Sequence, residues 1–130
     1  MMQIRLNPDH ELQLYKQLAN QLIEMIATGE LKNGDTLPSV RVMAADLGIN
    51  LNTVSKSYHE LESKGLIELR PKAKALIIGG IPREAEEGKL QQVEQALKPV
   101  MAEAYALGLE KEQITSLFQR ILKQWNGGSL

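Results

Sequence analysis

Three apolar stripes of helical period follow one another in the first 65 residues, and a glycine ends each of them. Apolar side chains that recur every three or four residues turn one face of a helix toward a core. Glycine readily adopts the left-handed backbone conformation in which helices often end. The pattern therefore predicts three short helices in succession. The stripes and their glycines are Leu12–Ile26 with Gly29, Ser39–Leu47 with Gly48, and Leu51–Lys64 with Gly65.

Two short runs of β type come next, Leu66–Arg70 and Ala75–Ile78. Three helices followed by a β-ribbon within about 80 residues is the element order of a winged helix-turn-helix. The segment Met43–Ile49, followed by Thr53 and Val54, has the matching helix-turn-helix spacing. In that motif the second helix presents its N-terminal residues to the major groove of DNA. An ordinary helical hairpin gives the same local signals, so both interpretations stay open at this point.

A linker is expected at Gly79–Pro82, which divides the chain into a winged helix over residues 1–80 and an extension over residues 81–130. The extension carries two further helical stripes, and Pro99 is expected to kink or break the first of them near Lys98. About 50 residues are too few for an independent core, so we expect a second copy of the chain to cover the apolar faces. The residues predicted to form this dimer contact are Leu97, Val100, Met101, Ala104, Ile114, Leu117, Phe118, Ile121, Leu122 and Trp125.

The charge balance and the residue types narrow the range of functions. The chain has 15 basic and 16 acidic residues, so it is no polycation, although residues 41–74 hold six basic against four acidic side chains. It has no cysteine, which excludes disulfides and thiolate sites and suits a reducing cytoplasm. No apolar run is long enough to span a membrane. His10 and His59 stand alone, and no nucleophile–base pair or phosphate-binding loop is present, so we expect no metal site, no cofactor and no enzyme activity.

Three segments closely resemble the GntR family of bacterial transcription regulators: Leu14–Leu18, Gly34–Arg41 and Asn52–Ile67. The resemblance covers residues 11–78 without a gap, and the rest of the chain is similar to the short dimerisation tail of the YtrA-type subfamily. It implies a mainly α-helical winged-helix fold with a small β-wing, a homodimer, and repression of a nearby operon, which in YtrA-type members often encodes an ABC transporter. A small-molecule effector would have to use a small pocket near the linker or the dimer interface.

Family residues transfer to particular positions of this chain. Arg41 matches an arginine that contacts DNA, and its cationic side chain in a first helical turn opposes the helix dipole, so an external anion would favour it. Thr53 matches a phosphate contact, and Lys56 matches a basic position. Asn50 is expected to cap the helix and Asn52 to face the groove. The full set predicted to bind DNA is Ser39, Arg41, Asn50, Leu51, Asn52, Thr53, Lys56, Lys72 and Lys74.

The chain departs from the family pattern in three places. Many members have arginine where this chain has Leu51, arginine is also common at the position of Ser55, and the glycine-rich wing tip is replaced by Pro71–Ala75. We predict a homodimeric repressor of double-stranded operator DNA. The alternative is a winged-helix module that binds other proteins and has little affinity for DNA, which the neutral charge and the missing arginine would favour.

Overall fold

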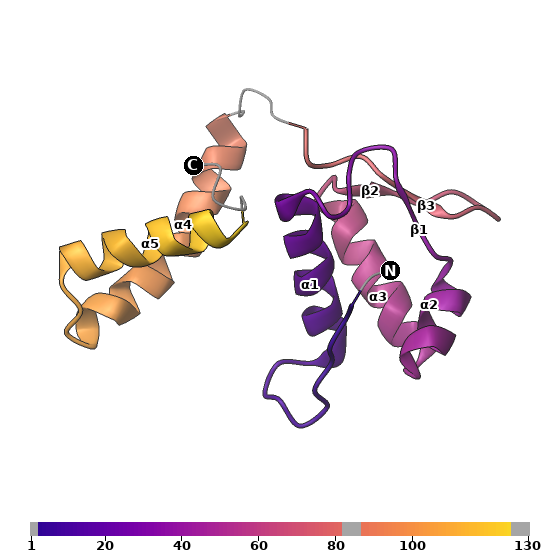
Figure 1. Cartoon of the computed structure of the whole chain (residues 1–130), viewed down its shortest axis with the longest axis horizontal. Helices are drawn as coiled ribbons and strands as arrows, with labels where there is room; N and C mark the ends of the chain where they lie inside the picture. The colour runs from indigo at the N-terminus through magenta and orange to yellow at the C-terminus, as the bar shows by residue number, and fades with distance from the viewer. Residues whose placement is uncertain (1–2, 82–86, 126–130) are drawn as a thin grey trace. The chain divides into compact units, whose positions relative to one another are not determined.

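The computed structural model describes residues 3–81 and 87–125, and the chain divides into two compact units, residues 1–81 and 82–130. Unit 1 contains three helices, α1 (Leu14–Thr28), α2 (Val40–Leu47) and α3 (Leu51–Ser63). It also contains three short strands, β1 (Thr36–Leu37), β2 (Ile67–Glu68) and β3 (Ala75–Ile77). Unit 2 contains α4 (Glu87–Ala106) and α5 (Lys111–Trp125). The prediction of a mainly α-helical winged-helix fold is confirmed (Figure 1).

The helices of unit 1 begin and end where capping residues stand. Ser39 and Asn50 cap α2 and α3 with their side chains, as predicted. Gly48 ends α2 with a φ of 67°, a left-handed conformation that glycine adopts without strain from a side chain. The amide of Ile49 then donates to the carbonyl oxygen of Ala44, 3.1 Å away, which closes the turn between the two helices.

A three-stranded antiparallel sheet in the order β1-β3-β2 replaces the two-stranded ribbon that the sequence predicts. Thr36 pairs with Leu76 and Leu37 with Ala75, so Thr36–Leu37, for which the sequence shows no strand pattern, supplies an edge strand. Two residues are too few to show a period of two, and β1 exists only because β3 lies beside it. The turn between β2 and β3 extends away from the three helices (Figure 1).

The core of unit 1 lies between the three helices and one face of the sheet. Side chains from α1, α3 and the strands are fully buried there, in agreement with the predicted apolar stripes. At 1% exposure or less they are Leu18, Ala19, Leu22, Leu37, Val54, Ser57, Tyr58, Leu61, Ile67 and Ile77.

An extended N-terminal segment is attached to α1 by two glutamines one helical turn apart. The amide of Arg5 donates to Oε1 of Gln21 at 2.9 Å, and the amide of Asn7 donates to Oε1 of Gln17 at 2.8 Å. Each glutamine donates in return to the carbonyl oxygen of the same residue. The two side-chain amides thus take the place of a neighbouring strand.

Two glycines of the expected linker pack against unit 1. The amide of Gly79 donates to the carbonyl oxygen of Leu66 at 3.1 Å. A methyl group on Gly79 would lie 2.8 Å from Cδ2 and 3.3 Å from Cα of Leu66, so glycine is required there for close approach of the backbone. Gly80 lies against Ile26. Pro82, the last residue of the expected linker, lies outside the described residues.

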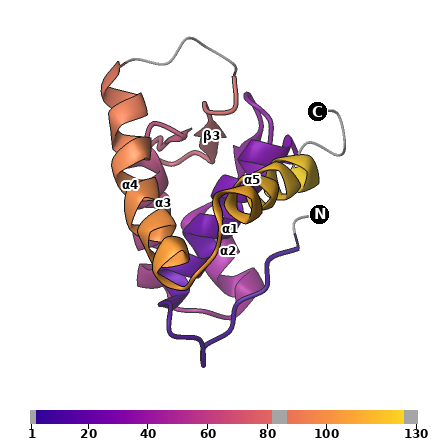
Figure 2. The ribbon, with the colours of Figure 1, turned by 90° about the vertical axis from the view of Figure 1, so that its left-hand side faces the viewer.

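Unit 2 consists of two helices that diverge from the turn joining them (Figures 1 and 2). In α5, Glu112 stands in the first turn and Lys123 in the last, and both charges interact favourably with the helix dipole. A kink or a break is expected at Pro99, and the break is wrong, because α4 continues through that residue. A proline removes one backbone donor and crowds one carbonyl group, and the remaining turns of a 20-residue helix keep their own hydrogen bonds.

Candidate nucleic-acid interface

The first turns of α2 and α3 hold most of the residues predicted to bind DNA. Oγ of Ser39 accepts a hydrogen bond from the amide of Val42 at 3.2 Å, and Oδ1 of Asn50 accepts one from the amide of Asn52 at 2.7 Å. Each cap satisfies a backbone donor that the helix itself cannot satisfy. The cap occupies the carbonyl oxygen of the Asn50 side chain, whereas the exposed side chain of Asn52 makes no such cap.

Four predicted contact residues at these helix starts are exposed: Arg41, Asn50, Leu51 and Asn52. Leu51 leaves 40% of its surface exposed, so it contributes little to the core. Thr53 is half-buried, and its amide donates to the carbonyl oxygen of Asn50 at 3.1 Å. Among the predicted contact residues, the two helix starts therefore present one cation, one apolar side chain and two amides to solvent.

Lys56, which stands one turn further along α3, lies over an aromatic ring. Its Nζ is 4.0 Å from the centre of the Tyr15 ring in the first turn of α1. From the sequence, Lys56 is predicted only as a basic position, and its contact with Tyr15 is not predicted. Tyr15 lies within the Leu14–Leu18 motif, and that motif is the one signal in the sequence that points to it.

Polar contacts hold α3 against α1 and against the residues that precede α2. Oγ of the fully buried Ser57 donates to the carbonyl oxygen of Tyr15 at 2.6 Å. The hydroxyl of Tyr58 donates to the carbonyl oxygen of Pro38 at 2.7 Å. Burial raises the pKa of the Tyr58 hydroxyl, so it stays protonated and continues to donate.

An ion pair adds to the contact between α1 and α3. Nζ of Lys16 lies 3.0 Å from Oε1 of Glu60, and only 18% of the Glu60 side chain is exposed. The other carboxylate oxygen, Oε2, is buried without a hydrogen-bond partner among the described residues. These contacts fix the rotation of α3, and with it the direction in which the first turn faces.

The turn between β2 and β3 carries the two predicted wing lysines. Lys72 and Lys74 are exposed, and the amide of Ala73 donates to the carbonyl oxygen of Arg70 at 3.3 Å across the turn. Lys72 has a φ of 57°, which is left-handed backbone usually occupied by glycine. The tip of the wing has therefore lost its glycine and kept the conformation that favours one.

In Figure 1, α1 lies on one side of α3, and α2 and the turn between β2 and β3 lie on the other side. Arg41 on α2 and Lys72 and Lys74 on that turn are all exposed. Exposed cations can contact phosphates, and an exposed helix start can reach base edges.

The residues predicted to form the dimer contact lie on α4 and α5. Ile114 is the one buried member, and no residue described on α4 is buried. Half-buried members are Leu97, Met101, Ala104, Ile121 and Trp125, and exposed members are Val100, Leu117, Phe118 and Leu122.

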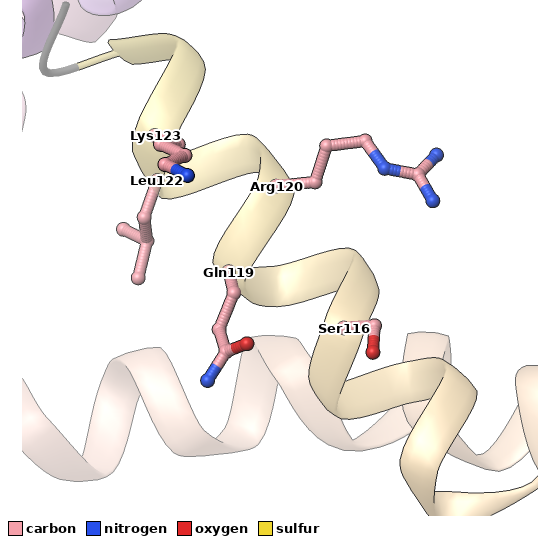
Figure 3. A pocket seen from close by; sticks show the side chains of 5 residues that line it. All are labelled: Ser116, Gln119, Arg120, Leu122 and Lys123. Atoms are coloured by element: carbon pink, nitrogen blue, oxygen red, sulfur yellow. The ribbon is translucent and has the colours of Figure 1, made fainter. Parts of the chain in front are cut away.

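Two shallow hollows are open to solvent. One lies on α5 and is lined by Ser116, Gln119, Arg120, Leu122 and Lys123, with the side chains of Arg120 and Gln119 pointing to different sides of the helix (Figure 3). The other lies between the N-terminal segment and α2, and Ile4, Arg5, Pro38, Met43 and Asp46 are among its lining residues.

The two histidines do not form a metal centre among the described residues. Nδ1 of His10 accepts a hydrogen bond from the amide of Leu12 at 3.0 Å. His59 is exposed on α3, and its Nδ1 lies 3.7 Å from the carboxylate of Glu62. No helix among the described residues is long and apolar enough to cross a membrane.

Comparison with known proteins points to one family. A family described as bacterial regulatory proteins, gntR family, matches residues 14–77. The HTH-type transcriptional repressor YtrA of Bacillus subtilis is 34% identical over 125 residues, which cover 96% of each chain.

Two solved structures extend the likeness to the fold. A transcriptional antiterminator from Listeria monocytogenes has a TM-score of 0.87 at 27% identity, over 99% of this chain and 96% of that one. YtrA from Sulfolobus acidocaldarius, described as a GntR-family transcription factor, has a TM-score of 0.57 at 38% identity, over 73% of this chain and 97% of that one.

Proposed function

This chain belongs to the gntR family of bacterial regulatory proteins, and we propose that it represses transcription by binding an inverted-repeat operator as a homodimer. It is a DNA-binding transcriptional regulator, as its relatives are. Repression is supported by the name of the Bacillus subtilis relative, which matches this chain over nearly its whole length. The same likeness favours DNA binding over the alternative of a protein-binding module.

The observation that carries the proposal is the exposed pair of helix starts on α2 and α3. Arg41 would contact a phosphate or a guanine edge, and Asn52 has the free amide that can pair with adenine. Thr53, which is half-buried, would contact a phosphate. Lys72 and Lys74 would approach phosphates or the minor groove from the wing.

The homodimer is supported by the state of unit 2. Two helices that bury one side chain between them do not make a stable domain. The apolar stripe on α5, with Leu117, Phe118 and Leu122 exposed in the isolated chain, would be covered by the same stripe of a second copy. Two-fold symmetry would then place the recognition helices about 34 Å apart, one turn of DNA, and require an inverted repeat.

The proposal also includes a small-molecule effector that changes the affinity for the operator. The α5 hollow lies within the proposed dimer region and fits the expected location, since Arg120 and Lys123 would favour an anionic ligand. A shift of the operator affinity on addition of such a ligand would establish the role, and loss of that shift in Arg120→Ala would assign it to this hollow.

Footprinting on the DNA upstream of the gene for this chain tests the proposal. We expect protection of two half-sites about one helical turn apart, and an affinity that falls steeply as salt increases from 50 to 200 mM. A control duplex of the same length and random sequence should bind more weakly. Equal binding to both duplexes, or an affinity that salt leaves unchanged, would contradict sequence-specific repression.

A further inference from the structure

The ammonium group of Lys56 lies over the ring of Tyr15, 4.0 Å from its centre, and this contact joins the recognition helix α3 to α1. The distance is well inside the range in which a cation is attracted to the face of an aromatic ring. Lys56 is exposed, and no described carboxylate pairs with it. The ring of Tyr15 is therefore the group that holds the end of this long side chain.

We propose that Tyr15 is a positioning residue for DNA binding: its ring holds the Lys56 ammonium at the place on α3 from which it meets a backbone phosphate. The inference rests on the proposed binding of DNA by α3. It assigns to the first turn of α1 a role in the affinity for DNA, although Tyr15 itself need not touch the DNA.

The contact leaves the ammonium free to bind an anion. A ring face attracts a cation without taking up its hydrogen-bond donors in the way a carboxylate would, and a lysine has three of them. A phosphate oxygen can therefore approach from the solvent side while the ring stays behind the nitrogen. A lysine side chain that moves freely in solvent loses more conformational entropy when it binds a phosphate than one that is already held in place.

The position of the ring is itself fixed by contacts that do not involve it. The carbonyl oxygen of Tyr15 accepts the 2.6 Å hydrogen bond from Ser57, the residue that follows Lys56. The neighbouring Lys16 pairs with Glu60 at 3.0 Å, one turn further along α3. Both contacts use the backbone of Tyr15 or another side chain, so they survive a substitution of the ring.

The test compares two variants of Tyr15 in the full chain. Tyr15→Phe keeps the ring face and removes the hydroxyl, whereas Tyr15→Leu keeps an apolar side chain and removes the ring. The probe is a duplex from upstream of the gene, with a random duplex of equal length as control. We expect Tyr15→Phe to bind like the wild type and Tyr15→Leu to lose about two- to fivefold in affinity.

Lys56→Gln shows whether the effect of Tyr15 passes through the lysine. This variant should lower the slope of log K against log salt by about 0.9, the value for one phosphate contact. Adding Tyr15→Leu to Lys56→Gln should then change the affinity no further. The NMR signals of the Lys56 side chain next to its ammonium should show a ring-current shift that persists in Tyr15→Phe and disappears in Tyr15→Leu.

Each of the following results would overturn the proposal. If Tyr15→Leu lowers the affinity equally in the wild type and in Lys56→Gln, the tyrosine acts only on the fold. The same conclusion follows if the loss of affinity is accompanied by a fall in the melting temperature that accounts for it. If Tyr15→Phe binds as weakly as Tyr15→Leu, the hydroxyl contacts DNA directly. If the wild type binds neither duplex, the proposed function fails. This result differs from one in which the wild type and Tyr15→Leu both bind equally tightly, which would overturn only the role of Tyr15.

Discussion

The hydroxyl of Tyr58 donates a hydrogen bond to the carbonyl oxygen of Pro38, 2.7 Å away, and so ties the middle of α3 to the residue before the cap of α2. Tyr58 is 1% exposed and is one of the largest fully buried side chains of unit 1. Ser39 and the first turn of α2, which includes Arg41, follow Pro38 directly. The bond therefore links the interior of unit 1 to the surface proposed to contact DNA.

The first prediction is that Tyr58→Phe lowers the free energy of unfolding by about 1 kcal/mol, because the carbonyl oxygen of Pro38 loses its buried donor. Denaturant unfolding at neutral pH measures the difference. Wild-type stability in Tyr58→Phe would show that another donor replaces the hydroxyl.

The same hydrogen bond predicts a dependence on pH above 10. Burial raises the pKa of Tyr58 in the folded chain, whereas the unfolded chain has the ordinary value of about 10. Above pH 10 the unfolded state therefore binds fewer protons than the folded state, and the free energy of unfolding contributed by Tyr58 falls as the pH rises. Above pH 10 the free energy of unfolding of the wild type should fall relative to that of Tyr58→Phe. From pH 6 to 9 the difference between the two should stay constant.

Local signals in the sequence were sufficient for the helices of unit 1 and for the caps of α2 and α3. Ser39, Asn50, Gly29 and Gly48 act within a few residues of themselves, so their roles can be predicted without the fold. β1 and the contact between Tyr15 and Lys56 could not be predicted in this way. Each depends on a partner far away along the chain, which only the packing of the whole unit brings close.

A second prediction concerns the wing, where Lys72 has left-handed backbone. Lys72→Gly should raise the free energy of unfolding by about 0.5–1 kcal/mol, because glycine adopts this conformation without strain. It should also weaken DNA binding and lower the salt slope by about 0.9, if Lys72 contacts a phosphate. Lys72→Ala is the matched control, since it removes the charge and keeps the strain. A gain in stability in both variants would trace the strain to something other than the backbone.

The third prediction is that Arg41→Ala weakens operator binding by about 1–3 kcal/mol if the guanidinium pairs with a base edge. Arg41 is exposed in the first turn of α2, where its charge opposes the helix dipole, so its loss should not lower the melting temperature. A loss of affinity that is the same for operator and random duplex would assign Arg41 to a phosphate. Unchanged binding to both would remove Arg41 from the interface.

The fourth prediction is that unit 2 holds the proposed dimer together. Truncation after Ile81 keeps the whole core of unit 1 and removes the exposed side chains of Leu117, Phe118 and Leu122. The truncated chain should unfold cooperatively, sediment as a monomer and bind the operator far more weakly, because it loses the second half-site. A truncated chain that sediments as a dimer would place the interface in unit 1.

The last prediction concerns Leu51, which stands 40% exposed in the first turn of α3. A leucine there cannot pair with a guanine edge, but it can pack on the methyl group of thymine. We therefore expect an A·T pair opposite Leu51 in each half-site. Leu51→Arg should shift the preference at that pair toward G·C, and it should steepen the salt dependence if the new charge reaches a phosphate. Selection from a randomised half-site, carried out for both proteins, measures the preference at every position. Thr53→Ser is a suitable control, since it keeps a hydroxyl in the same turn. If wild type and Leu51→Arg select the same base throughout, Leu51 does not face the groove, and the specificity of α3 would have to come from Asn52 and its neighbours instead.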